Sequence, residues 1–138
     1  MRFKIPEGSI QHEYAFEVKE RHLDALQHVN NVVYLEWINE ISEKHWNILA
    51  DEKIRARFFW VVLRHEIDYA QQALLGDLVT IRSWVGESRG AKSVRYVQIL
   101  KGDQLLAQSK STWCLIGASD LKPCRIPEEI HRLLEVTG

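Results

Sequence analysis

The chain has 138 residues, the length of one domain, and its 46% hydrophobic and 27% charged residues are typical of a soluble globular protein. Its formal net charge of -1 gives no electrostatic reason to expect a nucleic acid or an anionic membrane as a partner. No apolar run approaches the roughly 20 residues that cross a bilayer, and residues 1–10 are no signal peptide, so we expect one domain, residues 1–138, in the cytoplasm.

The first half of the chain predicts a strand followed by a long helix. Tyr14, Phe16 and Val18 alternate with less apolar residues, which predicts a half-buried strand over residues 12–20. A polar loop, residues 21–27, follows it. Residues 30–50 then carry apolar side chains at steps of three and four without a proline, which predicts a helix. Its expected buried stripe consists of Val33, Trp37, Ile41, His45 and Ile48.

The second half predicts strands joined by short turns. After a charged turn at residues 51–57, strand patterns cover residues 58–70, 78–85, 93–100 and 105–116. The pair Gly102-Asp103 between the last two indicates a tight hairpin. Pro127, followed by two acids and an apolar pattern, predicts a short C-terminal helix.

This order of elements predicts an α+β fold in which about five antiparallel strands curve around one long central helix. The amphipathic helix must bury its apolar stripe on the sheet. Such a sheet has exposed edges, which proteins often cover with a second subunit, so we expect a homodimer, or a homotetramer built as a dimer of dimers.

The two cysteines and the histidines indicate neither a disulfide framework nor a metal site. Cys114 and Cys124 are separated by nine residues, which matches no zinc or redox motif, although the pair could form one disulfide. The histidines lack the spacing of metal ligands. We therefore expect a reducing compartment and no metal.

The stretch of residues 24–34 joins the first strand to the long helix and carries the chemistry. Asp24 precedes a helix N-terminus, where unpaired backbone N–H groups and the helix dipole favour an oxyanion. A carboxylate beside such donors can attack a carbonyl directly or deprotonate a water molecule.

The run from Asp24 through His28-Val29-Asn30-Asn31 to Tyr34 resembles the 4-hydroxybenzoyl-CoA thioesterase branch of the hotdog superfamily. Further similarity lies in Arg64 to Tyr69 with Leu75-Gly76-Asp77, and in Trp84-Val85-Gly86 through Ala91. The resemblance implies a hotdog fold and hydrolysis of acyl-CoA thioesters without a cofactor, CoA being part of the substrate.

Carried over to this chain, the resemblance makes Asp24 the catalytic base or nucleophile and places oxyanion donors on the backbone near Asn30, Asn31 and Val32. His28 matches the histidine of plant acyl-ACP thioesterases, but Leu26 stands where those enzymes have an asparagine. This departure favours the simpler bacterial scheme. His28 is equally well a structural residue that holds the loop.

The resemblance also implies a site for CoA on the strand connection Arg89-Gly90-Ala91-Lys92-Ser93. Two cations flank a glycine that lets the backbone approach a phosphate. Asn30 and Tyr34 are further candidates for substrate contacts. Each has an alternative role: the asparagines as helix caps, Tyr34 as core or pocket wall, and Arg89 and Lys92 as a solvated turn.

The expected function is hydrolysis of a small-molecule acyl thioester. The same pocket would also serve an acyl-ACP thioesterase, or a non-catalytic module that binds acyl-CoA or an acyl carrier. A basic surface around the pocket mouth would favour the carrier protein, which is acidic.

Overall fold

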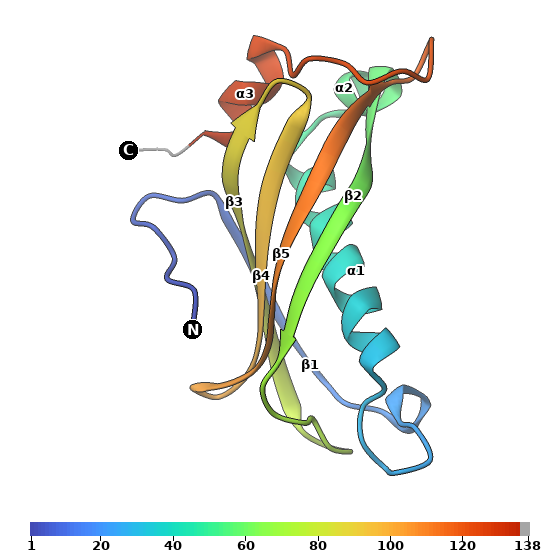
Figure 1. Ribbon diagram of the computed structural model, residues 1–138, viewed down its shortest axis with the longest axis vertical. Helices are drawn as coiled ribbons and strands as arrows, with labels where there is room; N and C mark the ends of the chain where they lie inside the picture. Colours follow the sequence, from blue (N-terminus) through green and yellow to red (C-terminus); the bar gives the residue numbers. More distant parts are fainter. Residues whose placement is uncertain (136–138) are drawn as a thin grey trace.

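The computed structural model describes residues 1–135, and its sheet and long helix confirm the predicted α+β hotdog fold (Figure 1). The elements in chain order are β1 (Gln11–Glu17), the 3-10 helix η1 (Glu20–His22), α1 (Asn31–Leu49), α2 (Glu52–Arg57), β2 (Phe58–Tyr69), β3 (Leu78–Arg89), β4 (Lys92–Lys101), β5 (Gln104–Gly117) and α3 (Glu128–Leu134).

The five strands form one antiparallel sheet in the order β1-β3-β4-β5-β2, so β1 and β2 are its edges. Helix α1 packs across one face (Figure 1). The N-terminal arm crosses the other face, where Phe3 N–H donates to the Gln108 side chain and the Gln98 amide donates to Phe3 C=O. Because neighbouring strand residues face opposite sides, Val97 and Ile99 point toward α1 while Gln98 holds the arm.

The core consists of two apolar clusters along α1. The first surrounds Trp37, Ile38 and Ile41, and the second surrounds Trp46 and Ala50 near α3. Buried polar side chains lie between and beside the clusters, among them His45, Ser83, Arg95, Ser109 and Ser111. Buried polar groups are stable where they find hydrogen-bond partners; His45, Ser83, Arg95 and Ser111 do so, whereas the Ser109 hydroxyl has no partner within residues 1–135.

The expected buried stripe of α1 is correct from Val33 to His45 but wrong at Ile48, whose side chain is 65% exposed. Leu49 and Ala50 face the second cluster instead. A sheet twists, so the side of a straight helix that lies against it rotates along the helix. The contact therefore passes from the side of Trp37 to the side of Trp46 and Ala50.

The expected charged turn at residues 51–57 is also wrong, because most of it forms helix α2. The Asp51 carboxylate caps it by accepting the Ile54 N–H at 2.9 Å. An aspartate is a preferred N-cap, so the signal was present in the sequence. The predicted hairpin at Gly102 is confirmed: Lys101 pairs with Gln104, and Gly102 adopts a φ of 58°.

Asp77, in the connection between β2 and β3, links this connection to the end of β4 at the bottom of the sheet in Figure 1. Its carboxylate accepts the Leu74 N–H at 2.9 Å and the ammonium of Lys101 at 2.9 Å. Burial alone would raise the pKa of Asp77, but these hydrogen bonds and the charge of Lys101 outweigh it and lower the pKa below its usual value.

We expect Asp77→Asn to lower the free energy of unfolding by about 1 kcal/mol at pH 7. A carboxyl with a lowered folded pKa stabilises the fold above its unfolded pKa, near 3.9, and this stabilisation is lost as the pH falls through the folded pKa. Urea denaturation at pH 7 and pH 2.5 measures the effect. Asp103→Asn, on the neighbouring hairpin, is the control. An equal deficit at both pH values would contradict the assignment.

Candidate active site

Asp24 lies in a tight loop between η1 and α1, and one of its carboxylate oxygens holds that loop. Oδ1 accepts the backbone N–H of Leu26 at 2.9 Å and that of His28 at 3.3 Å. The Asp24 N–H donates to His28 C=O at 2.9 Å, and Gln27 turns the chain with a φ of 64°. Within residues 1–135, Oδ2 has no hydrogen-bond partner. The loop is thus preorganised, and one oxygen of a half-buried carboxylate is left available.

The loop is fixed to the rest of the molecule through its backbone. Val29 N–H donates to Ala73 C=O at 3.1 Å, and Asn30 N–H donates to His22 C=O at 3.0 Å. The side chain of His28 is half-buried and makes no hydrogen bond within the described chain. His28 therefore contributes to the loop through its main chain, and its ring carries no visible link to Asp24.

One of the predicted oxyanion donors, the Val32 N–H, is already hydrogen-bonded within the N-terminal cap of α1. Asn30 is the N-cap, and its Oδ1 accepts the Val32 N–H at 3.0 Å. Val33 N–H donates to Asn30 C=O at 2.8 Å. The Asn31 N–H, by contrast, has no acceptor among residues 1–135. Of the backbone groups proposed from the sequence, Asn31 N–H is the one free to bind an oxyanion.

Tyr34 supports the site from inside the core. Its side chain is 2% exposed, and its hydroxyl accepts the Ala73 N–H at 3.0 Å. Its ring packs against Trp37 and Tyr69 at centroid distances of 5.4 Å and 5.6 Å. Burial raises the pKa of Tyr34. This position suits a residue that fixes the loop to the sheet, since Ala73 also accepts a hydrogen bond from Val29.

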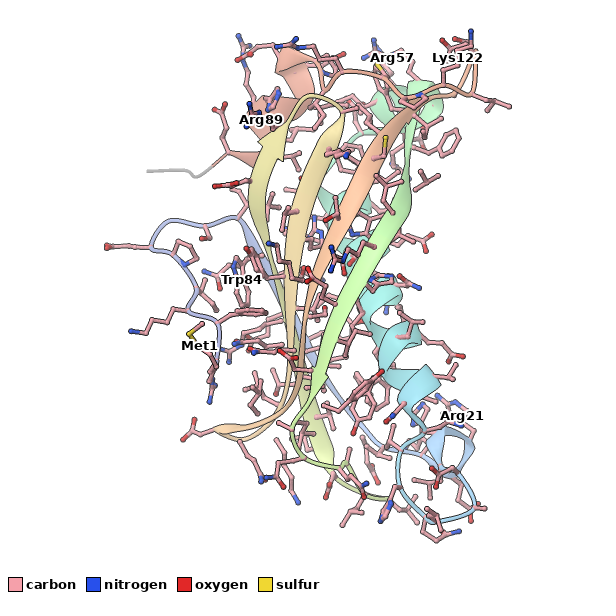
Figure 2. All side chains as sticks on the ribbon, viewed as in Figure 1. Met1, Arg21, Arg57, Trp84, Arg89 and Lys122 are labelled. Carbon is pink, nitrogen blue, oxygen red and sulfur yellow. The ribbon has the colours of Figure 1, made fainter. Side chains whose placement is uncertain are left out.

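The predicted CoA-binding connection lies at the opposite end of the folded molecule from the Asp24 loop. In Figure 2, Arg89 is near α3 at the top, whereas Arg21, close to the Asp24 loop, is at the bottom. Arg89 and Lys92 are exposed, and Gly90 adopts a φ of 62°. The carbonyls of Gly90 and Ala91 accept the N–H groups of Ile126 and Leu115, and Ser93 bonds Ser88. Within a single copy of the chain, the predicted CoA-binding connection and Asp24 are therefore far apart.

A cavity of about 510 Å³ lies beside the C-terminal half of α1, at the N-terminal end of β2. Its polar lining residues are Asn39, Glu43, Asn47 and Arg55, which are exposed, and Ser42, Ser93 and Arg95, which are buried. Its other lining residues are Trp46, Phe58, Phe59, Trp60, Trp113 and Leu134. Ser42 is eleven residues beyond Asn31 in α1, or roughly 16 Å along the helix.

Arg95 reaches this cavity from β4 and is held by His45 and Ser83. Its Nη1 donates to His45 Nδ1 at 2.6 Å and to Ser83 Oγ at 2.9 Å. Burial, followed by the charges of Arg95 and His12, lowers the pKa of His45 to about 3, so the imidazole is neutral and can accept. Burial lowers the pKa of Arg95 to about 10, which leaves it charged at neutral pH.

The sequence reasoning missed Arg95, although a signal was present. Ser93, Arg95, Val97 and Ile99 alternate along β4 and therefore share the face that points toward α1. A charged residue in that register predicts a buried cation. No group of three or more His, Cys, Asp or Glu residues in the described part of the chain is placed to hold a metal ion.

Comparison with known proteins identifies the family. Residues 18–134 match the thioesterase-like superfamily. The long-chain acyl-CoA thioesterase FadM of Escherichia coli K12 is 29% identical over 129 residues, covering 86% of this chain and 93% of that protein.

Two solved structures share the fold. YbaW of Escherichia coli, described as a probable thioesterase, is 28% identical, with a TM-score of 0.77 over 91% of this chain and 98% of that one. A probable thioesterase of Bartonella henselae is 26% identical, with a TM-score of 0.72 over 85% and 98% of the two chains. These matches confirm the expected enzyme class, a thioester hydrolase. The chain belongs to the thioesterase-like superfamily.

Proposed function

We propose that the protein hydrolyses acyl-CoA thioesters to a free acid and CoA, with Asp24 as general base or nucleophile. The observation that carries the proposal is the free Oδ2 of Asp24 in a loop that leads directly into the N-terminus of α1, where the Asn31 N–H has no acceptor within residues 1–135. Similarity to a long-chain acyl-CoA thioesterase supports CoA esters as the substrate class.

The chemistry requires little more than these two groups. The thioester carbonyl oxygen accepts from the Asn31 N–H, which is worth about 2.7 to 4 kcal/mol in comparable oxyanion holes. Asp24 attacks the carbonyl carbon or takes a proton from a water that does so, and general base catalysis contributes about 10²- to 10⁴-fold. The C–S bond then breaks and CoA leaves as its thiolate. With water as the attacking group the free acid forms in this step; with Asp24 as the nucleophile a mixed anhydride forms, and a water molecule hydrolyses it to the free acid and the Asp24 carboxylate. The scheme uses no cofactor and no metal.

A second copy of the chain would complete this site. The edge strand β2 exposes Phe59, Val61, Val62 and Leu63, and an edge of this kind favours pairing. The C-terminal end of β2 lies at the Asp24 loop, because the Tyr69 hydroxyl donates to Asn31 C=O at 3.4 Å. Its N-terminal end lines the cavity through Phe58, Phe59 and Trp60.

Pairing of β2 with β2 of a second copy about a two-fold axis makes the two strands antiparallel. The Asp24 end of each copy then lies beside the cavity of the other. We propose a homodimer, alone or as half of a tetramer, in which one copy supplies the carboxylate and its partner supplies the acyl pocket. The turn that carries Arg89, near the cavity end of β4, would bind the CoA phosphates from that same partner.

The cytoplasmic location stays a prediction. Both cysteines are free thiols, which suits a reducing compartment. No helix among the described residues is long and apolar enough to cross a bilayer.

We expect Asp24→Asn to keep the fold and to lower kcat for acyl-CoA by at least about 100-fold. The asparagine retains an Oδ1 that can accept from Leu26 and His28, so only the negative charge is lost. Asp24→Ala removes both loop hydrogen bonds as well and should also reduce stability, by about 1 to 2 kcal/mol. Thiol release and thermal unfolding measure the two effects.

The control for the two Asp24 variants is Asp120→Asn, at the opposite end of the folded molecule. This variant should hydrolyse acyl-CoA at the wild-type rate. Full activity of Asp24→Asn would remove Asp24 from the mechanism. A folded wild-type protein that releases no thiol from short, long or aromatic acyl-CoA would instead point to a carrier-protein substrate or a non-catalytic binding module.

We expect Arg89→Ala to raise KM for acyl-CoA roughly fivefold, about 1 kcal/mol, with a smaller effect on kcat. An exposed guanidinium that binds a phosphate contributes to ground-state binding and does not touch the carbonyl. Lys122→Ala, another exposed cation at the same end of the molecule (Figure 2), should leave KM unchanged. Equal KM values for the two variants would exclude Arg89 from the CoA site.

We expect Leu63→Arg to convert the dimer to a folded monomer with little activity. Leu63 is 53% exposed in the single chain, so the charge does not disturb the core, but it would be buried against the second copy. Sedimentation velocity gives the mass and circular dichroism the fold. Leu121→Arg is the control, since Leu121 is 70% exposed at a distant turn. A monomeric Leu63→Arg protein with full activity would show that one chain is sufficient.

A further inference from the structure

The buried side of the cavity carries a positive charge that no acidic residue among residues 1–135 neutralises. Arg95 is 7% exposed, and none of the ion pairs within residues 1–135 includes it. Its two hydrogen bonds, to His45 and Ser83, both leave from Nη1 and both go to neutral acceptors. The donors on Nε and Nη2 have no protein acceptor within the described chain, and Arg95 lines the cavity.

Such an arrangement is costly unless a ligand completes it. Taking an ion out of water costs several kcal/mol even after the protein relaxes, and pairing with an anion is the usual compensation. A cavity meant only for the methyl end of a fatty acyl chain would have hydrocarbon at this position. Here three buried polar residues, Ser42, Ser93 and Arg95, line it instead.

The wall of the cavity also contains Trp113, whose buried Nε1–H has no hydrogen-bond partner within residues 1–135. An indole nitrogen is a donor only. A buried donor left without a partner costs about 1 to 3 kcal/mol, so the free donors of Arg95 favour a ligand that brings an acceptor into the cavity.

The remaining charges at the cavity do not cancel its preference for a negatively charged ligand group. Arg55 and Glu43 are exposed lining residues, and the Arg55 guanidinium donates to Ala50 C=O at 3.2 Å. The lining therefore carries two guanidinium groups and one carboxylate. Because Glu43 is solvated while Arg95 is buried, the field in the interior of the cavity is positive.

We propose that this cavity binds a carboxylate at the far end of the acyl group, so that the preferred substrates are CoA monothioesters of dicarboxylic acids. The inference rests on the proposed hydrolase function and specifies its substrate class. The aromatic walls hold the methylene chain, and Arg95 forms a charge-assisted hydrogen bond with the terminal carboxylate. In a volume of about 510 Å³ there is room for a chain of several carbons together with its carboxylate.

The test compares substrates that differ only at the far end: adipyl-CoA with hexanoyl-CoA, and sebacyl-CoA with decanoyl-CoA. We expect the wild-type kcat/KM to favour the carboxylated member by at least about tenfold in one of the pairs, because a site built around buried donors discriminates against a ligand that leaves them unpaired. A preference for the plain chain in both pairs would overturn the proposal without involving any variant.

Two variants assign the preference to Arg95. Arg95→Gln removes the charge but keeps an N–H for His45. It should reduce the ratio of kcat/KM for the carboxylated substrate to kcat/KM for the plain substrate to about one or below. Arg95→Lys keeps the charge and should retain part of the ratio. Lys53→Gln, which removes an exposed cation of α2 that does not line the cavity, should keep the wild-type ratio. A ratio that survives in Arg95→Gln, with the fold verified by circular dichroism, would exclude Arg95.

Binding of stable thioethers separates this proposal from the hydrolase function. Calorimetry with S-(5-carboxypentyl)-CoA and S-hexyl-CoA measures the contribution of the terminal carboxylate without turnover. Tighter binding of the carboxylated thioether, lost in Arg95→Gln, supports the site even if no ester is hydrolysed. Equal dissociation constants for the two thioethers, with active hydrolysis of hexanoyl-CoA, would remove the carboxylate site and leave the hydrolase intact.

Discussion

The packing of α1 across a twisted antiparallel sheet is the constraint on which the rest of the molecule depends. The helix begins at the Asp24 loop and ends beside the second core cluster, so its two ends lie in different surroundings. The Asn30 cap sets where the helix starts and leaves the Asn31 N–H unpaired within residues 1–135. The twist then turns Trp46 toward the sheet. The way α1 lies on the sheet therefore determines both the unpaired N–H beside the Asp24 loop at one end of the helix and the cavity at the other end.

The same packing explains why the core is divided by polar residues. His45 is the point where α1 passes from the first cluster to the second, and it meets Ser83 of β3 through the guanidinium of Arg95. Burial keeps the imidazole neutral, with a pKa of about 3, so that it accepts from a cation that it would otherwise repel. The layer holds Arg95 in one orientation, and an ordered guanidinium is what recognition of a carboxylate requires.

Much of the fold could be predicted from periodicity, because burial on one face produces alternation in strands and steps of three and four in helices. The strands and α1 follow this rule. Ile48 does not, because the direction of the buried face depends on the twist of a sheet formed by distant residues. Helix α2 was missed for another reason: its residues form no apolar stripe, and only the Asp51 cap marks it.

The candidate site was less predictable than the fold. The Asp24 loop could be located because a run of adjacent residues carries it, and its backbone bonds are local. The cavity could not, since its walls come from α1, α2, β2, β4 and β5, which meet only in the folded chain. Arg95 illustrates the difference. Its register in β4 predicts burial, but only the structure shows that no carboxylate lies opposite it within the described chain.

The separation along α1 of Asn31, next to the Asp24 loop, from Ser42 in the cavity, roughly 16 Å, has a consequence for how such a protein can change its substrate. In the proposed dimer, the carboxylate and the oxyanion donor come from one copy, and the residues that contact the far end of the acyl group come from the other. Substitutions on β4 or in the second half of α1 then alter the pocket without disturbing the loop that performs hydrolysis. Specificity in this architecture can therefore vary while the chemistry stays fixed.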